Sequence, residues 1–268
     1  MIVYHDMPLK YVFEFSNEYP FLVEASWLQA VEPLKGKQLK LLTGELHKKR
    51  PITWILDPGP DGTTSVEEYL RLLETYTPDQ VVMLDIPGDM DATLNSYRKL
   101  LKHAMVRQYV EMDMMIFPVQ GRNEKELLTC ARKIERLTYN LCMSPYLGLP
   151  YRRFGGNTCL ERARNRVNFI CKTAEENKWP GPIHLLGMWD ICEVAMLIEY
   201  VDSIDTRYAF LQAALNKSSM DIRAETTGFG RASKNFHKTI LTRKQRALFF
   251  KNCQVMDDMA AEKKFPRF

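Results

Sequence analysis

Four polar side chains stand directly after short apolar runs of this 268-residue chain. They are Asp57 after Trp-Ile-Leu, Asp85 after Val-Val-Met-Leu, Gln120 after Phe-Pro-Val and Asp205 after Val-Asp-Ser-Ile. Carboxylates that lie close together push their pKa values apart, so one can stay ionised as a nucleophile while another holds a proton as general acid. Such a pair suits displacement at the anomeric carbon of a sugar through a covalent glycosyl intermediate.

Aspartates at the ends of strands have two other common uses in proteins. An aspartate after a strand most often caps the next helix or starts a turn. Aspartates that meet can also hold a divalent metal such as Mg²⁺. No histidine stands at metal-ligand spacing from them, and the six cysteines are scattered without a Cys-x-x-Cys pair. We therefore expect reduced cysteines, no metal site and no cofactor, and we interpret all five histidines as structural or surface residues without evident partners.

The four polar residues can meet only if the strands before them are parallel and end on one face. Short apolar runs alternate with amphipathic stretches along the chain, which is typical of parallel strands joined by helices. The strands are expected at 11–15, 39–43, 52–56, 81–85, 115–120, 141–145, 183–187 and 202–205, and helices at 65–76, 124–137, 158–177 and 189–200. This order predicts an α/β fold, a (β/α)8 TIM-type barrel, with a flavodoxin-like open sheet as the alternative.

The positive charge is concentrated near the C-terminus. The chain carries a net charge of +4, yet residues 217–251 contain nine bases and only two acids. We therefore divide the chain into a catalytic barrel, 1–216, and a basic C-terminal extension, 217–268, that contacts nucleic acid. The residues expected at phosphates are Arg231, Lys234, Lys238, Arg243, Lys244 and Arg246. Four phenylalanines among them suit either stacking on bases or docking of a helix on the core.

Composition excludes several classes of protein. Hydrophobic residues make up 46% and charged residues 26% of the chain, which is ordinary for a globular protein and excludes disorder. No stretch approaches the roughly 18 apolar residues of a membrane span, and the N-terminus does not read as a secretory signal. We expect a cytoplasmic protein without a membrane partner.

Six motifs between residues 52 and 215 resemble those of a known family. They read Ile-Leu-Asp57-x-Gly, Val-Met-Leu-Asp85, Pro-Val-Gln120-Gly, Leu-Gly-Leu-Pro150, His184-Leu-Leu-Gly-Met-Trp and Val-Asp-Ser-Ile-Asp205. In order and spacing they resemble the tRNA-guanine transglycosylase family, whose motifs run strand-Asp-Ser-Gly-Gly, Val-Met-x-Phe-Asp-Glu, Ile-Val-Gln-Gly, Gly-Gly-Leu, Tyr-Leu-Met-Gly-Val-Gly and Gly-Ile-Asp-Met-Phe-Asp. The resemblance implies a base exchange in which guanine leaves a nucleoside and a 7-deazaguanine enters.

Roles follow from the resemblance, position by position. It implies that Asp205 is the nucleophile and that Asp57 is the general acid and base. Asp85 would recognise the guanine edge, and Gln120 would contact the carbonyl or cyano side of the base. The remaining substrate-binding positions, which offer backbone groups or an apolar face to the base, are Gly148, Leu149, Leu186 and Gly187.

The chain departs from the family at several points. Pro58 replaces the serine after the first aspartate, Asp61 stands where the family has a stacking aromatic, and the Pro-Thr-Arg after the nucleophile is absent. The family's C-terminal zinc subdomain has no counterpart. The chain therefore looks more like the compact relatives, encoded by phages and genomic islands, that insert 7-deazaguanines into DNA.

The resemblance, with its departures, predicts a DNA-guanine transglycosylase whose partners are DNA and a free 7-deazaguanine. If the chain is phage-encoded, the expected location is the host cytoplasm. An accessory protein or a homodimer is a possible further partner. The alternatives are a compact tRNA-guanine transglycosylase, with tRNA as partner, and a catalytically idle nucleic-acid-binding subunit. An unrelated barrel acting on sugars or phosphates would explain the acids, but not Gln120-Gly or Gly148-Leu.

Overall fold

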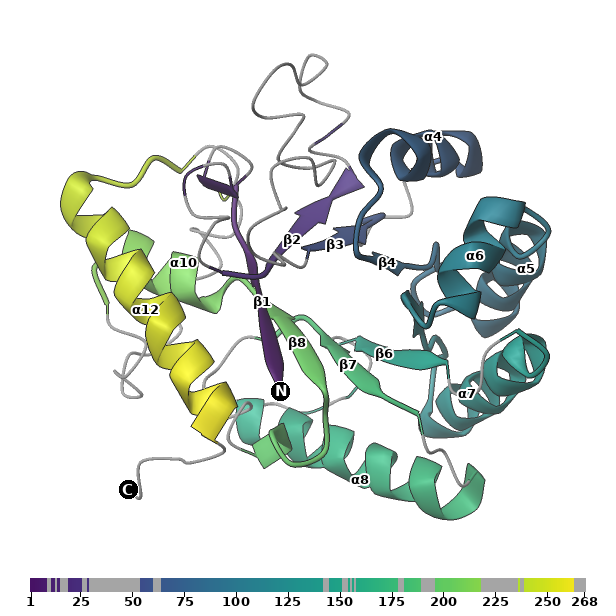
Figure 1. Ribbon diagram of the computed structural model, residues 1–268. Helices are drawn as coiled ribbons and strands as arrows, with labels where there is room; N and C mark the ends of the chain where they lie inside the picture. Colours follow the sequence, from purple (N-terminus) through teal and green to yellow (C-terminus); the bar gives the residue numbers. More distant parts are fainter. Residues whose placement is uncertain are drawn as a thin grey trace.

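The protein is a closed barrel of eight parallel strands that pair in sequence order, so the predicted (β/α)8 fold is confirmed (Figure 1). The computed structural model describes residues 1–8, 11–12, 14, 19–25, 28, 54–59, 64–141, 145–150, 154, 156, 158–177, 181–188, 196–217, 236 and 239–262. The strands are β1 (Ile2–Asp6), β2 (Phe21–Glu24), β3 (Trp54–Asp57), β4 (Gln80–Val82), β5 (Met115–Pro118), β6 (Tyr146–Pro150), β7 (Ile183–Leu186) and β8 (Ser203–Thr206).

Helices surround the barrel (Figure 1). They are α4 (Val66–Tyr76), α5 (Met90–Leu100), α6 (Ala104–Glu111), α7 (Glu124–Thr138), α8 (Cys159–Asn177), α10 (Tyr208–Ala214) and α12 (Arg243–Glu262). The helices predicted at 65–76, 124–137 and 158–177 are confirmed. Polar caps explain two of the starts, since Ser65 accepts a hydrogen bond from the Glu68 N–H and Asn123 accepts one from the Glu126 N–H. Most of the helix predicted at 189–200 lies outside the described residues, and α5 and α6 were not predicted.

One predicted strand is wrong, and three strands (β1, β2 and β6) were not predicted at their positions. Residues 11, 12 and 14 are helical, whereas the first two strands are β1 and β2. Residues 142–144 of the strand expected at 141–145 lie outside the described residues, Leu141 belongs to the turn after α7, and the strand β6 begins at Tyr146. The strand expected at 39–43 lies outside the described residues.

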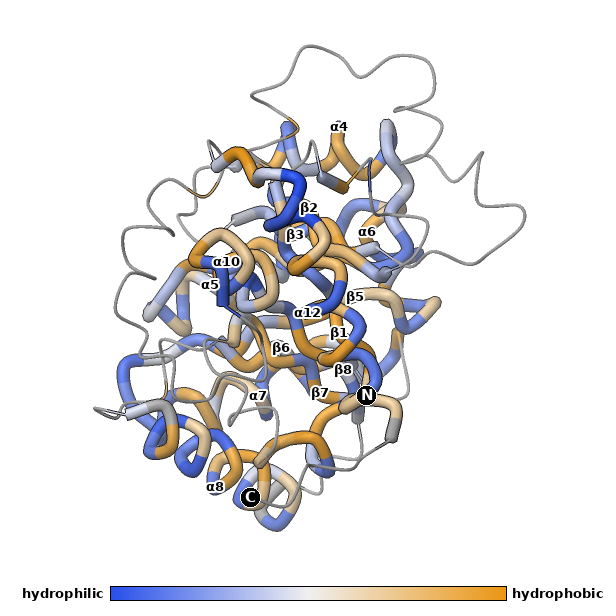
Figure 2. The backbone as a smooth tube through the Cα atoms, turned by 90° about the vertical axis from the view of Figure 1, so that its left-hand side faces the viewer, coloured by the Kyte–Doolittle hydropathy of each residue, from blue (hydrophilic) through white to orange (hydrophobic). Residues whose placement is uncertain are grey.

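The strands bury side chains on both faces, which is why their sequences contain short continuous apolar runs. The barrel interior holds a small cluster of Tyr4, Leu22, Ile55, Val82 and Ile116, while a larger core fills the space between the sheet and the helices. Along α8 the colour in Figure 2 changes repeatedly between hydrophobic and hydrophilic, as expected for a helix that covers a sheet with one side. Within the described residues no helix is long and apolar enough to cross a bilayer.

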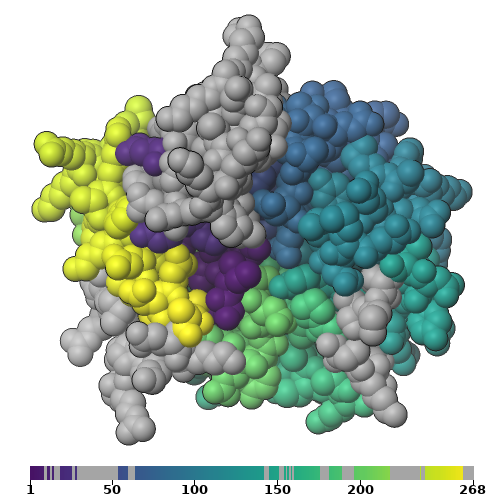
Figure 3. All heavy atoms as spheres, viewed as in Figure 1, coloured from purple at the N-terminus to yellow at the C-terminus, as the bar shows by residue number. Residues whose placement is uncertain are grey.

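The last helix, α12, packs against α10 and β1. Phe249 and Phe236 are both buried, and each makes an edge contact with Phe210 of α10. These two phenylalanines therefore serve core packing rather than stacking on nucleic-acid bases. The final turns of α12 lie against the first residues of the chain (Figure 3), where Asp257 binds buried His5 at 3.0 Å. The boundary at residue 216 remains a prediction.

Candidate active site at the carboxyl ends of the strands

The four predicted polar residues lie at the carboxyl ends of their strands. Asp57 is the last residue of β3 and Asp205 lies within β8, while Asp85 and Gln120 follow β4 and β5 closely. Gln120 Nε2 donates a hydrogen bond to Asp85 Oδ2, and Gln120 Oε1 accepts one from the Gly88 N–H at 2.9 Å. The structure thus brings together groups that are separated by up to about 150 residues, as a barrel requires.

Asp57 occupies an environment that favours its protonated form. Burial raises the pKa of Asp57 well above its usual value, and the charge of Glu24 raises it further. Smaller contributions in the same direction come from Asp205 and Asp85. Against them acts the Gly59 N–H, which donates to Asp57 Oδ1 at 2.8 Å and lowers the pKa. Gly59 has φ +94°, a conformation that favours glycine.

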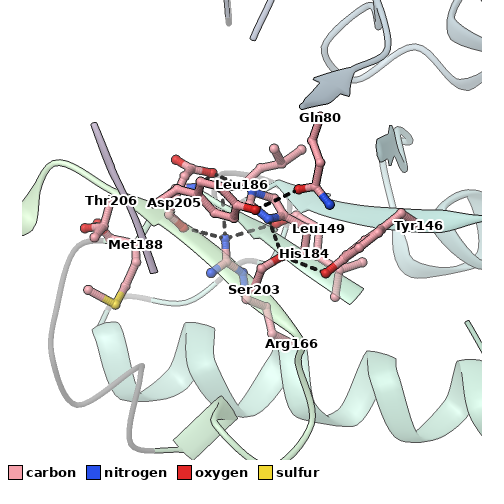
Figure 4. A network of polar contacts seen from close by, with 12 residues as sticks. Gln80, Tyr146, Leu149, Arg166, His184, Leu186, Met188, Ser203, Asp205 and Thr206 are labelled. Carbon is pink, nitrogen blue, oxygen red and sulfur yellow. Dashed lines mark hydrogen bonds and ion pairs between the residues drawn. The ribbon is translucent and has the colours of Figure 1, made fainter. Parts of the chain in front are cut away.

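The Asp205 carboxylate is held by two hydrogen-bond donors. Its Oδ1 accepts hydrogen bonds from the Gly187 N–H at 3.0 Å and from His184 Nε2 at 3.1 Å (Figure 4). Gly187 has φ +76°, again favouring glycine. The expectation that His184 is a histidine without evident partners is therefore wrong: the ring is buried in the barrel and contacts the proposed nucleophile.

A chain of polar groups continues from His184 into the barrel interior (Figure 4). His184 Nδ1 lies 2.8 Å from Ser203 Oγ, which lies 2.9 Å from the hydroxyl of Tyr146. Beside them the Tyr4 hydroxyl donates to Gln80 Oε1 at 3.0 Å. The interior beneath Asp205 is thus polar and hydrogen-bonded.

Two acids at the same end were missed by sequence reasoning. Asp6 ends β1 and Glu24 ends β2, and both form ion pairs with Arg207, two residues after Asp205. Burial raises the pKa of Asp6 to about 7 although the Arg207 charge lowers it, and the Glu24 charge adds to the increase. The Arg207 guanidinium also lies 4.6 Å from the centre of the Phe236 ring. The missed signal was again an acid ending a short apolar run, Ile-Val-Tyr-His-Asp6 and Phe-Leu-Val-Glu24.

The positions on β6 and β7 that are expected to bind substrate are tightly packed. A Cβ atom at Gly148 would come within 2.8 Å of Leu186 Cδ1, the end of a flexible side chain, and within 3.2 Å of Pro118 Cα, so a larger residue there would require its neighbours to shift. Buried Arg166 of α8 donates from Nη2 to the backbone carbonyls of Leu149 and Leu186 at 3.3 Å, and to that of Gly187 at 3.1 Å. Arg166 was also missed, and it fixes the ends of both strands.

The basic residues expected at phosphates are only partly described. Arg231, Lys234 and Lys238 lie outside the described residues.

The other three bases are exposed in the first turn of α12. Arg246 pairs with Glu14 at 3.3 Å and lies over the Tyr11 ring, so its positive charge is already partly neutralised within the protein. Just before α12 the Leu241 N–H donates to the hydroxyl of Tyr11, which follows β1 in the chain, so the first turn of α12 with Arg243 and Lys244 lies toward the end of the barrel at which β1 finishes.

The acids do not gather into a metal-binding cluster in the described part of the chain, where no group of three His, Cys, Asp or Glu side chains has that arrangement.

Comparison with known proteins supports the fold and nothing beyond it. No family model and no curated protein matches the chain. Among solved structures it is similar to 2,3-dimethylmalate lyase, a member of the PEP mutase/isocitrate lyase superfamily, with a TM-score of 0.50 and 13% identity over 98% of this chain and 93% of that chain.

Proposed function

We propose that this protein is a DNA-guanine transglycosylase, which exchanges guanine in DNA for a 7-deazaguanine such as 7-cyano-7-deazaguanine. The observation that carries the proposal is the difference between two carboxylates at one end of the barrel. Burial and neighbouring charge favour a proton on Asp57, whereas N–H donors hold Asp205. One acid and one nucleophile are what displacement at an anomeric carbon needs.

The exchange proceeds in two balanced displacements. Asp205 forms a bond to C1′ of the nucleotide as the C1′–N9 bond breaks, and the electron pair passes to guanine, which takes the proton from Asp57. In the return step the 7-deazaguanine gives its proton to Asp57 and attacks C1′, and the electron pair of the ester bond returns to Asp205. No cofactor is required. Because C1′ is shielded in a duplex, the nucleotide must be turned out of the stack first.

The Asp85–Gln120 pair would read the base. A carboxylate accepts hydrogen bonds from the ring imino and exocyclic amino protons of guanine, while the Gln120 amide faces the other side. Because Gln120 already donates to Asp85 and accepts from Gly88, the pair is oriented before a base arrives. This preorganisation favours a planar base with adjacent donors.

Asp85→Asn should lower kcat/KM for guanine by about 10- to 100-fold, since one or two acceptor contacts to the base are lost. Nucleic-acid affinity should stay within about threefold, because Asp85 touches the base and not the backbone. Steady-state exchange kinetics and a filter-binding assay measure the two quantities. Asp91→Asn removes the same charge from the exposed first turn of α5 and serves as the matched control. An equal change of kcat/KM in the two variants would show that Asp85 does not recognise the base.

The exposed bases of α12 support a polyanionic substrate. Reversing two of them, Arg243→Glu with Lys244→Glu, should weaken DNA binding and reduce the slope of log K against log salt by about 2, since each phosphate contact contributes about 0.9. The control reverses Arg132 and Arg136, exposed on α7 on the other side of the barrel (Figure 1). A salt slope that is the same in both double variants would place α12 outside the interface.

The alternatives differ in measurable ways. A compact tRNA-guanine transglycosylase would carry out the same chemistry with tRNA only, and an idle binding subunit would hold nucleic acid without exchange. The retained Asp57, Asp85 and Asp205 favour an active enzyme, because a binding subunit needs no nucleophile. Incorporation of labelled guanine into DNA by the purified protein tests the proposal.

A further inference from the structure

We propose that His184 is a positioning residue for the exchange reaction: together with the Gly187 N–H it holds Oδ1 of Asp205, so that Oδ2 is the oxygen that attacks the anomeric carbon. This inference rests on the proposed function. It adds an assignment of the attacking atom, and a residue that the motif comparison did not single out.

The two oxygens of Asp205 have different surroundings. Oδ1 receives both donors, the Gly187 N–H at 3.0 Å and His184 Nε2 at 3.1 Å. Within the described residues Oδ2 has no hydrogen-bond partner, and the Asp205 side chain keeps 11% of its surface exposed. A carboxylate fixed through one oxygen cannot rotate freely, so its bare oxygen keeps one direction. Alignment of this kind lowers the activation free energy of a displacement substantially.

The polar chain below His184 can place a proton on the ring nitrogen that faces Asp205. Tyr146 can donate to Ser203 Oγ, Ser203 can donate to His184 Nδ1, and Nε2–H then donates to Asp205. Burial raises the pKa of Tyr146 to about 12, so its hydroxyl keeps the proton that starts this chain. This arrangement uses both hydroxyl hydrogens and puts a ring proton on Nε2, facing Asp205.

The two donors also assist the second displacement. While the glycosyl ester exists, Oδ1 is its carbonyl oxygen and Oδ2 is bonded to C1′. When that bond breaks, the electron pair returns to the carboxylate, and the donors stabilise the charge that develops on Oδ1. This is the preorganised stabilisation expected of N–H groups aimed at a developing anion.

Two amide replacements separate positioning from packing. His184→Gln can place an amide N–H where Nε2 lies and so still donate to Asp205, whereas the shorter His184→Asn can place an amide only where Nδ1 lies, beside Ser203. We expect His184→Asn to lower kcat about 100-fold with both KM values within about threefold, and His184→Gln to stay within about tenfold of the original protein. Folding of each variant is checked by circular dichroism and thermal unfolding.

Nitrogen-15 NMR of histidine-labelled full-length protein tests the geometry without activity, with His184→Asn identifying the signal. The expected spectrum is that of a neutral ring protonated at Nε2. A ring protonated at Nδ1 alone would overturn the assignment, because it could not donate to Asp205.

The possible kinetic outcomes are distinct. Exchange by the original protein with a large loss in His184→Asn alone supports the inference. Exchange that is equally impaired in both variants, or unaffected in both, overturns the positioning role and leaves the proposed function standing. Absence of exchange by the original protein on every nucleic acid overturns the proposed function, and the role of His184 in it falls as well.

Discussion

We expect Asp205→Asn to abolish base exchange, with a loss of about 10,000-fold or more, while the fold and nucleic-acid affinity are kept. An amide oxygen is too weak a nucleophile to attack C1′. The local structure survives because asparagine Oδ1 still accepts hydrogen bonds from the Gly187 N–H and from His184. A denaturing gel run on protein mixed with labelled DNA measures the covalent intermediate, which should appear with the original protein and be absent from the variant.

Asp202→Asn is the matched control for this experiment. Asp202 lies just before β8, at the opposite end of the strand, where its Oδ2 accepts a hydrogen bond from the Ile183 N–H at 2.8 Å. The control should retain exchange and the covalent adduct. An adduct that persists in Asp205→Asn would assign the nucleophile to another residue.

Asp57→Asn should slow release of guanine by about 100- to 10,000-fold, the range typical for loss of a general acid. In the original protein the rate of guanine release should fall as pH rises through the raised pKa of Asp57, because only the protonated carboxyl can donate. The variant lacks this proton, so its rate should be low and flat over the same pH range. Single-turnover release of labelled guanine, followed from pH 5 to 9, measures both. A variant that keeps the pH dependence would assign the proton to another group.

The same raised pKa predicts an effect on stability. A carboxyl whose pKa is higher in the folded state binds more protons there, so its unfavourable contribution grows as pH rises from the unfolded value of about 4 to the folded value. Asp57→Asn should therefore raise the unfolding temperature at neutral pH, and this gain should shrink toward pH 4. Thermal unfolding at pH 4 and pH 8 is the measurement. If the variant were less stable than the original protein at pH 8, burial and neighbouring charge would not be destabilising the ionised Asp57 carboxylate.

The barrel and its cluster of acids were predictable because both depend on local pattern. Apolar runs that end in Asp57, Asp85 and Asp205 mark strands whose carboxyl ends must meet once the sheet closes. The same rule applies to Asp6 and Glu24, but Pro8 and Pro20 stand close to these runs and are typical of irregular segments. The pairing of these two strands with β8 and β3 becomes evident only when the barrel closes.

Other parts of the site depend on contacts that no local pattern encodes. His184 meets Asp205 because β7 and β8 pair with His184 opposite Ser203. Arg166 reaches three carbonyls only because α8 packs beneath β6 and β7. Likewise, the phenylalanines of the basic segment stand beside charged residues in sequence, but the packing of α12 on α10 decides which of them are buried.

The most direct test of the central claim is incorporation of a labelled base. The purified full chain is incubated with tritiated guanine, and separately with labelled 7-cyano-7-deazaguanine, in the presence of double-stranded DNA, single-stranded DNA or bulk tRNA, with Asp205→Asn as control. We expect label to enter DNA and unlabelled guanine to be released in equal amount, and we expect neither with the control. Label in tRNA alone would show that tRNA, and not DNA, is the substrate of the same chemistry. Absence of label from every nucleic acid, or equal incorporation by Asp205→Asn, would rule out base exchange through Asp205.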